Sequence, residues 1–193
     1  MIRSSFARIS ELTASFERPL DEQSQRLRDA LIALIESGRH IVLGAQATMF
    51  YTRPRYTADT DYAVGGEDFV KIRKWFEGSG VAYEFNGEAI ECPGLRVDVI
   101  DGSRNAVIEQ VLDRESGIPS LEAVAALKYV AAISPTRAYE RKQQDAADLA
   151  ALVLRPGFDE RAFLALFVGP YQAEAERAAG VVADIRAHRK TSL

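Results

Sequence analysis

The pattern of apolar residues changes near Ser103, and this change limits the folds that the chain can adopt. Before Ser103, helix-like and strand-like stretches alternate. After it, the chain is rich in alanine and has helical periodicity almost throughout. We therefore predict an α/β (α+β) fold, with an α/β core and N-terminal helices in residues 1–103. A helical region in residues 104–193 is expected to pack on that core.

The expected elements follow from apolar spacing and from turn residues. Strands are predicted at 40–44 and 60–64, and three short strands within 81–102 are separated by Asn86-Gly87 and Pro93-Gly94. Helices are predicted at 21–37, 45–51, 67–78, 106–114, 120–133 and 135–154, with further pieces near Phe163 and from Tyr171 onward.

Charge and cysteine content limit the functional classes. The formal net charge is -4 with both signs dispersed, so no general basic field for nucleic acid is present. One cysteine excludes an internal disulfide and fits a reducing compartment. Residues 1–20 lack the apolar core of a secretory signal, and no apolar stretch approaches the roughly 20 residues that cross a bilayer. We expect a soluble, cytoplasmic protein without a membrane partner.

Three aspartates accompany the predicted strands. Asp59 and Asp61 are two residues apart and would point to the same side of a strand, and Asp98 belongs to a later strand-like run. If these strands are neighbours, three carboxylates converge at one end of a sheet. Carboxylates buried without cations are costly. Hard divalent ions such as Mg²⁺ (or Mn²⁺) relieve that cost, and two ions about 3.5–4 Å apart can promote phosphoryl transfer.

Other interpretations apply to the same residues. A D-x-D pair taken alone is more often a solvated strand edge or a turn than a metal site. Asp101, beside Gly102, is interpreted as a turn residue. A phosphatase-type nucleophile would follow a continuous hydrophobic strand, whereas the polar stretch 53–58 precedes Asp59, which argues against that class.

A glycine turn precedes the aspartates. Gly44 ends one predicted strand and begins a helix fifteen residues before Asp59. A glycine at that point lets the backbone approach a ligand, and the free N–H groups of a helix start suit a phosphate. Arg53, Arg55 and Thr57 lie between the two motifs as further donors. A tight turn without a ligand and a solvated loop are the alternative interpretations.

The stretch VLGAQATMFYTRPRYTADTDYAV resembles the signature of the DNA polymerase β-like nucleotidyltransferase superfamily. Its R-x-T-x-D-x-D form is most similar to the minimal bacterial branch that includes AbiEii-type toxins. The resemblance covers roughly residues 25–155. It implies a mixed β-sheet flanked by helices and transfer of a nucleoside monophosphate from an NTP to a hydroxyl acceptor. A tRNA end, a protein or a small molecule could be that acceptor, and an antitoxin is a further partner that the branch suggests.

Residue by residue, the resemblance implies Asp59, Asp61 and Asp98 as catalytic and metal-binding carboxylates. The nucleotide-binding residues that it implies are Gly44, Ala45, Arg55, Thr57, Lys128 and Arg141. A basic-acidic string in residues 137–148 completes the pattern. Without the resemblance, Arg141 and Asp145 would be interpreted as an exposed i,i+4 pair on a solvated helix face.

The chain departs from the family pattern at three positions. Ala45 stands where a second glycine or a serine is usual, Gln46 is bulkier than expected, and Gln144 stands where a lysine is typical. These departures favour an alternative function, a catalytically degenerate member of the superfamily that acts as a binding or regulatory module. A third possibility is a structural helical adaptor, which would leave the aspartates exposed and far apart.

Overall fold

The computed structural model describes residues 19–54, 57 and 59–189. Its centre is a five-stranded sheet in the order β1-β2-β5-β4-β3. All neighbouring strands are antiparallel except β2 and β5, which are parallel. The strands are β1 (His40–Val42), β2 (Thr60–Val64), β3 (Glu84–Phe85), β4 (Ala89–Cys92) and β5 (Val97–Asp101).

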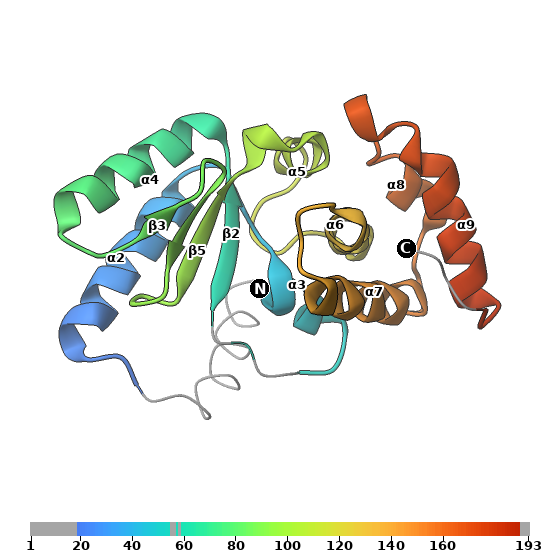
Figure 1. Cartoon of the computed structure of the whole chain (residues 1–193), viewed down its shortest axis with the longest axis horizontal. Helices are drawn as coiled ribbons and strands as arrows, with labels where there is room; N and C mark the ends of the chain where they lie inside the picture. The colour runs from blue at the N-terminus through green and yellow to red at the C-terminus, as the bar shows by residue number, and fades with distance from the viewer. Residues whose placement is uncertain (1–18, 55–56, 58, 190–193) are drawn as a thin grey trace.

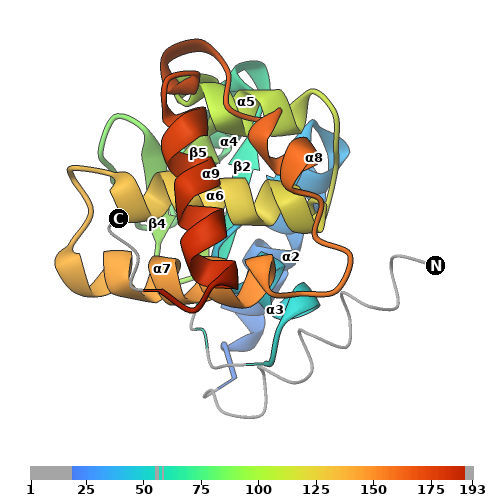
Figure 2. The same ribbon diagram turned by 90° about the vertical axis from the view of Figure 1, so that its right-hand side faces the viewer.

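Helices cover both faces of the sheet, as Figure 1 shows. One face carries α2 (Glu22–Ser37) and α4 (Gly66–Ser79). The other side holds α3 (Gly44–Tyr51), α5 (Ala106–Leu112), α6 (Leu121–Ile133) and α7 (Tyr139–Val153). Outside these lie α8 (Glu160–Leu164) and α9 (Glu174–Arg186), and α9 crosses α6 and α7 in the view of Figure 2. Short 3-10 helices occupy Gly102–Arg104 and Gly169–Tyr171. The predicted α/β fold, a mixed sheet flanked by helices, is confirmed.

Local sequence explains where several of the helices begin. The Asp21 side chain accepts a hydrogen bond from Ser24 N at 2.9 Å and so caps α2, and Ser120 caps α6 in the same way. The predicted helix at 135–154 instead begins at Tyr139. Since α6 ends at Ile133, the chain uses the intervening residues to bring α7 back against α6.

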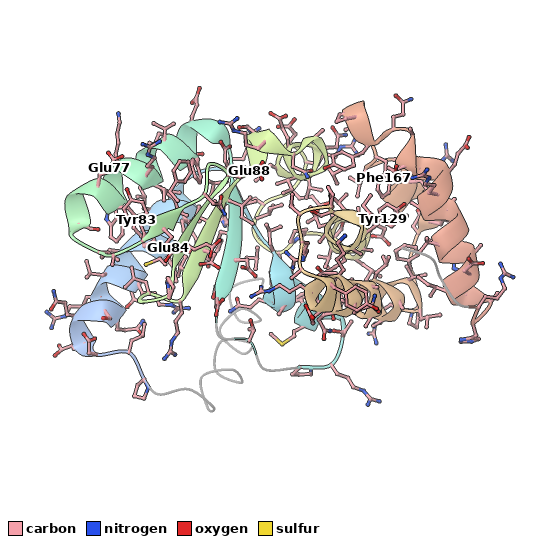
Figure 3. All side chains as sticks on the ribbon, in the orientation of Figure 1. Glu77, Tyr83, Glu84, Glu88, Tyr129 and Phe167 are labelled. Carbon is pink, nitrogen blue, oxygen red and sulfur yellow. The ribbon has the colours of Figure 1, made fainter. Side chains whose placement is uncertain are left out.

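The hydrophobic core is continuous across the change in sequence character at Ser103. Val64 of β2 and Val107 of α5 are both fully buried in one cluster that also reaches the C-terminal helices. There Tyr129 and Phe167 meet edge to face with their ring centroids 5.3 Å apart (Figure 3). The division into domains 1–103 and 104–193 stays a prediction, and its boundary falls within the 3-10 helix Gly102–Arg104.

The two edges of the sheet differ. The β1 edge is covered, because Val42 N donates to Gly117 O at 2.7 Å and Gly117 N donates to His40 O at 3.1 Å. The β3 edge consists of two exposed residues. Within the described ranges, none of the helices combines the length and the apolar character needed to cross a bilayer. The cytoplasmic location stays a prediction.

Candidate active site

Two of the three predicted carboxylates lie side by side on the sheet. The parallel strands β2 and β5 are neighbours, and Asp61 and Asp98 are direct partners in their register. Paired residues project from the same face, so both carboxylates emerge together. Asp59 lies just before β2, and its charge acts on Asp61 and on Asp98. The adaptor hypothesis, in which the aspartates are exposed and Asp98 lies far from Asp59, stays a prediction.

Gly44 makes room for the Asp61 carboxylate. A Cβ atom at position 44 would lie 1.9 Å from Asp61 Oδ2, far inside contact distance. Gly44 also has φ +61°, a left-handed conformation that other residues adopt at a cost. The backbone fixes the same contact, because Leu43 N donates to Asp61 O at 2.8 Å. The turn between β1 and α3 is therefore built around this one carboxylate.

The first turn of α3 faces the same region. Leu43 occupies the N-cap position and makes no side-chain cap hydrogen bond. Ala45 is half-buried in that turn. The Gln46 side chain turns aside, since its Nε2 donates to Thr60 Oγ1 at 2.7 Å, and Arg28 Nη2 reaches the same hydroxyl at 3.3 Å. Gln46 thus ties α3 to β2, which accounts for a bulky polar residue next to the turn.

Burial and mutual repulsion shift the carboxylates toward their neutral forms. Burial raises the pKa of Asp61, the Asp59 charge raises it further, and the charges of Lys128, Arg137 and Arg141 oppose the shift. Burial likewise raises the pKa of Asp98 to about 6, with smaller contributions from Asp61, Asp59 and Glu91. The Cys92 N–H, which donates to Asp98 Oδ1 at 3.2 Å, opposes that rise in the pKa.

The basic side chains near Asp61 come from α6, from α7 and from the connection between them. Lys128 is buried, and its Nζ lies 2.8 Å from Asp145 Oδ1 and 2.8 Å from Asp148 Oδ2. Arg137 Nε pairs with Asp145 Oδ2 at 2.5 Å. Asp145 is therefore not half of an exposed pair with Arg141. That interpretation is wrong, because the aspartate is turned inward to balance the buried lysine.

Gln144 and Arg141 differ in how they relate to this buried network. Gln144 Nε2 donates to Asp148 Oδ1 at 3.0 Å, so the residue that departs from the family pattern is hydrogen-bonded to the network. Arg141 is exposed on α7, yet its charge acts on Asp61. A cation that is exposed and electrostatically close to the carboxylates is available to an anionic ligand.

The remaining predicted residues are placed as follows. Thr57 is half-buried, and its hydroxyl donates to Asp59 O at 3.2 Å. Arg55 lies outside the described residues. Sequence reasoning missed Glu91, whose charge acts on Asp98 and which pairs with it across β4 and β5. Only the strand register reveals that contact, although alternation in β4 places Glu91 opposite to the buried Ile90 and Cys92.

Asp61 and Asp98 together are suited to bind a hard cation. Across the described part of the chain, no group of three His, Cys, Asp or Glu side chains is arranged as a ready-made metal site. Asp61, however, is half-buried, and within the same residues its carboxylate accepts no hydrogen bond. A half-buried carboxylate that accepts no hydrogen bond, beside a second carboxylate, fits Mg²⁺, which takes few protein oxygens and completes its shell with water or phosphate.

No protein-family model matches this chain, and a search of curated proteins finds no matching relative.

We predict that Gly44→Ala lowers the free energy of unfolding by about 2–4 kcal/mol, because the new Cβ collides with Asp61 Oδ2 and the backbone is strained. In an Asp61→Gly background the same change should cost only about 1 kcal/mol, since only the strain remains. Urea denaturation of the four proteins of this cycle gives the coupling. Equal costs in both backgrounds would show that the close approach does not exist.

Asp98 should make stability depend on pH. Its folded-state pKa of about 6 lies above the unfolded value near 4, so the contribution of Asp98 to stability is greatest below about pH 4 and is lost as pH rises through 6. Asp98→Asn keeps an acceptor for Cys92 N–H and removes this loss. We expect the variant to melt at a higher temperature than wild type at pH 8 and at the same temperature near pH 4. Asp29→Asn, at an exposed position on α2, is the matched control. A variant less stable at pH 8 would contradict this origin of the pKa.

Proposed function

We propose that the protein is a Mg²⁺-dependent nucleotidyltransferase that transfers a nucleoside monophosphate from an NTP to a hydroxyl acceptor. The observation that carries the proposal is the pairing of Asp61 with Asp98 beside the Gly44 turn. Such a pair at a helix start supplies oxygens for a cation and N–H groups for a phosphate in one place.

The distribution of charge supports the same proposal. Carboxylates lie on the strands, and the basic residues that act on Asp61 come from α6, α7 and their connection. A ligand that satisfies both sides must combine a divalent cation with a polyanion, and an NTP bound to Mg²⁺ does so. Lys128 is held by two aspartates, so it can offer a fixed positive charge without being free to move.

In this proposal each group has a defined task. Asp61 and Asp98 would hold the cation, which when bound neutralises charge on the reacting phosphates, and the charge of Asp59 acts on both carboxylates. The backbone N–H groups at Gly44 and Ala45 bind the β and γ phosphates, and Arg141 contacts the triphosphate from α7.

Proton transfer falls to Asp98. The acceptor oxygen forms a bond to the α-phosphorus while the bond from that phosphorus to the bridging oxygen breaks, and pyrophosphate leaves. The hydroxyl proton passes to the Asp98 carboxylate. A carboxylate placed beside the reacting hydroxyl can take up that proton as a general base.

A degenerate, non-catalytic member of the superfamily is the second candidate. Two residues that differ from the family pattern favour it, because their side chains are hydrogen-bonded within the protein. Gln46 donates to Thr60, and Gln144 donates to Asp148. Such a protein would bind a nucleotide or a partner without transferring a group. An antitoxin partner, implied by the same resemblance, stays a prediction.

Titration calorimetry with each NTP and Mg²⁺ tests the function. We expect wild type to bind at least one NTP, Asp61→Asn to lose binding, and Arg141→Ala to bind about tenfold more weakly while melting normally. Arg155→Ala is the matched control, since Arg155 is exposed beyond the far end of α7. No binding by wild type, or unchanged binding by Asp61→Asn, would contradict the proposal.

Labelled NTPs then separate the two candidates. Incubation with total cellular RNA and protein should label one of these fractions if the protein is an enzyme. Nucleotide binding that is lost in Asp61→Asn, without label in any fraction, would favour the binding module.

A further inference from the structure

The side chain of Thr60 joins three elements at the start of β2. Thr60 is buried, with an exposed fraction of 2%, whereas Asp59 and Asp61 on either side of it are half-buried. Its hydroxyl accepts a hydrogen bond from Gln46 Nε2 of α3 at 2.7 Å and a longer one from Arg28 Nη2 of α2 at 3.3 Å. A buried hydroxyl requires such partners, and here they come from two different helices, so the hydroxyl fixes how both helices meet the strand.

The first turn of α3 keeps three backbone donors free. Within the ranges that the structure describes, the N–H groups of Gly44, Ala45 and Gln46 make no hydrogen bond. A polar side chain at the N-cap usually satisfies one of these groups, but the N-cap residue here is Leu43, whose side chain is apolar. The three donors are therefore available to an anionic ligand.

Gln46 does not close this turn, although its position would allow it. A glutamine at the third helical position commonly folds back and bonds the backbone N–H of the N-cap residue. Here that N–H, on Leu43, donates to Asp61 O at 2.8 Å, and the Gln46 amide bonds Thr60 instead. The amide is thus held by the strand and does not occupy the end of the helix.

Two contacts to consecutive residues of β2 hold the turn. Leu43 N donates to Asp61 O, and Gln46 Nε2 donates to Thr60 Oγ1. One contact alone would leave the start of α3 free to rotate about it, whereas two contacts three residues apart on the helix set both its position and its rotation. The direction of the free N–H groups depends on that rotation, and hydrogen bonds weaken steeply when the donor is misaligned.

We propose that Thr60 is a positioning residue for phosphate binding, which acts through Gln46 and sets the orientation of the free N–H groups of α3. The inference rests on the proposed function, in which this turn binds the β and γ phosphates of an NTP. It also gives Gln46 a task in an active protein, because the bulky amide is matched by a hydroxyl on the neighbouring strand.

Nucleotide binding by variants of the full chain tests this role. Thr60→Val removes the hydroxyl and keeps the branched side chain, Gln46→Met removes the amide and keeps an unbranched side chain of good helix propensity, and Thr60→Ser keeps the hydroxyl. In titration calorimetry with Mg²⁺ and the NTP that wild type binds most tightly, we expect the Kd to rise about tenfold in Thr60→Val and in Gln46→Met. Thr60→Ser should stay within about twofold of wild type, because it retains the bond to Gln46. The double variant Thr60→Val/Gln46→Met should bind no more weakly than either single variant, since both remove the same hydrogen bond.

A second ligand and a control variant separate positioning from a general loss of structure. Inorganic triphosphate offers the turn its phosphates without a sugar or a base, so Thr60→Val should weaken its binding by the same factor as that of the NTP. Thr52→Val is the matched control, because it removes a half-buried hydroxyl that donates to Thr48 O at the other end of α3. This control should leave the binding of both ligands unchanged.

Four results would overturn the positioning role while NTP binding by wild type leaves the proposed function intact. They are unchanged NTP binding by Thr60→Val, additive losses in the double variant, a loss in Thr60→Ser equal to that in Thr60→Val, and a loss for the NTP that triphosphate does not share. Absence of NTP binding by wild type would overturn both the proposed function and this inference.

Discussion

The close approach of Asp61 to Gly44 is the contact on which the rest of the site depends. It places a carboxylate at the first turn of α3, and it requires a residue without a side chain in a left-handed conformation. Because Asp61 is also paired in register with Asp98, the same contact fixes where the second carboxylate stands relative to that turn. Burial disfavours the ionised form of both carboxyl groups and so raises their pKa values. A cation bound between them would stabilise the ionised form.

The helical half of the chain contributes the opposite charge. Lys128 is buried between Asp145 and Asp148, and Arg137 balances the first of these aspartates. The two aspartates pair with the buried lysine and hold its ammonium group at a fixed position near Asp61. Arg141 adds a second cation that solvent and ligands can reach. The site therefore combines carboxylates on the sheet with basic residues on the helices that face Asp61.

Local sequence was sufficient to predict the helices and strands, but it was not sufficient to predict the contacts between them. The strand at 60–64 was predicted with its observed bounds, and the glycine turn was placed correctly, because both depend on short-range patterning. Pairing between β2 and β5 joins residues that are far apart in the chain. From the sequence, we could therefore say only that the carboxylates would converge if these strands were neighbours. The burial of Asp145 could not be read from α7 alone, since its partner Lys128 lies on another helix. Glu91 was missed for the same reason, because its relation to Asp98 exists only in the register of β4 and β5.

The central claim is that Asp61 and Asp98 together hold a divalent cation beside the Gly44 turn. Anomalous diffraction from crystals soaked in Mn²⁺ with a non-hydrolysable NTP analogue tests it most directly. The account predicts an anomalous peak between the two carboxylates, with the triphosphate against the first turn of α3. Crystals that contain the bound analogue but show no peak between Asp61 and Asp98, or show Mn²⁺ bound elsewhere, would contradict it.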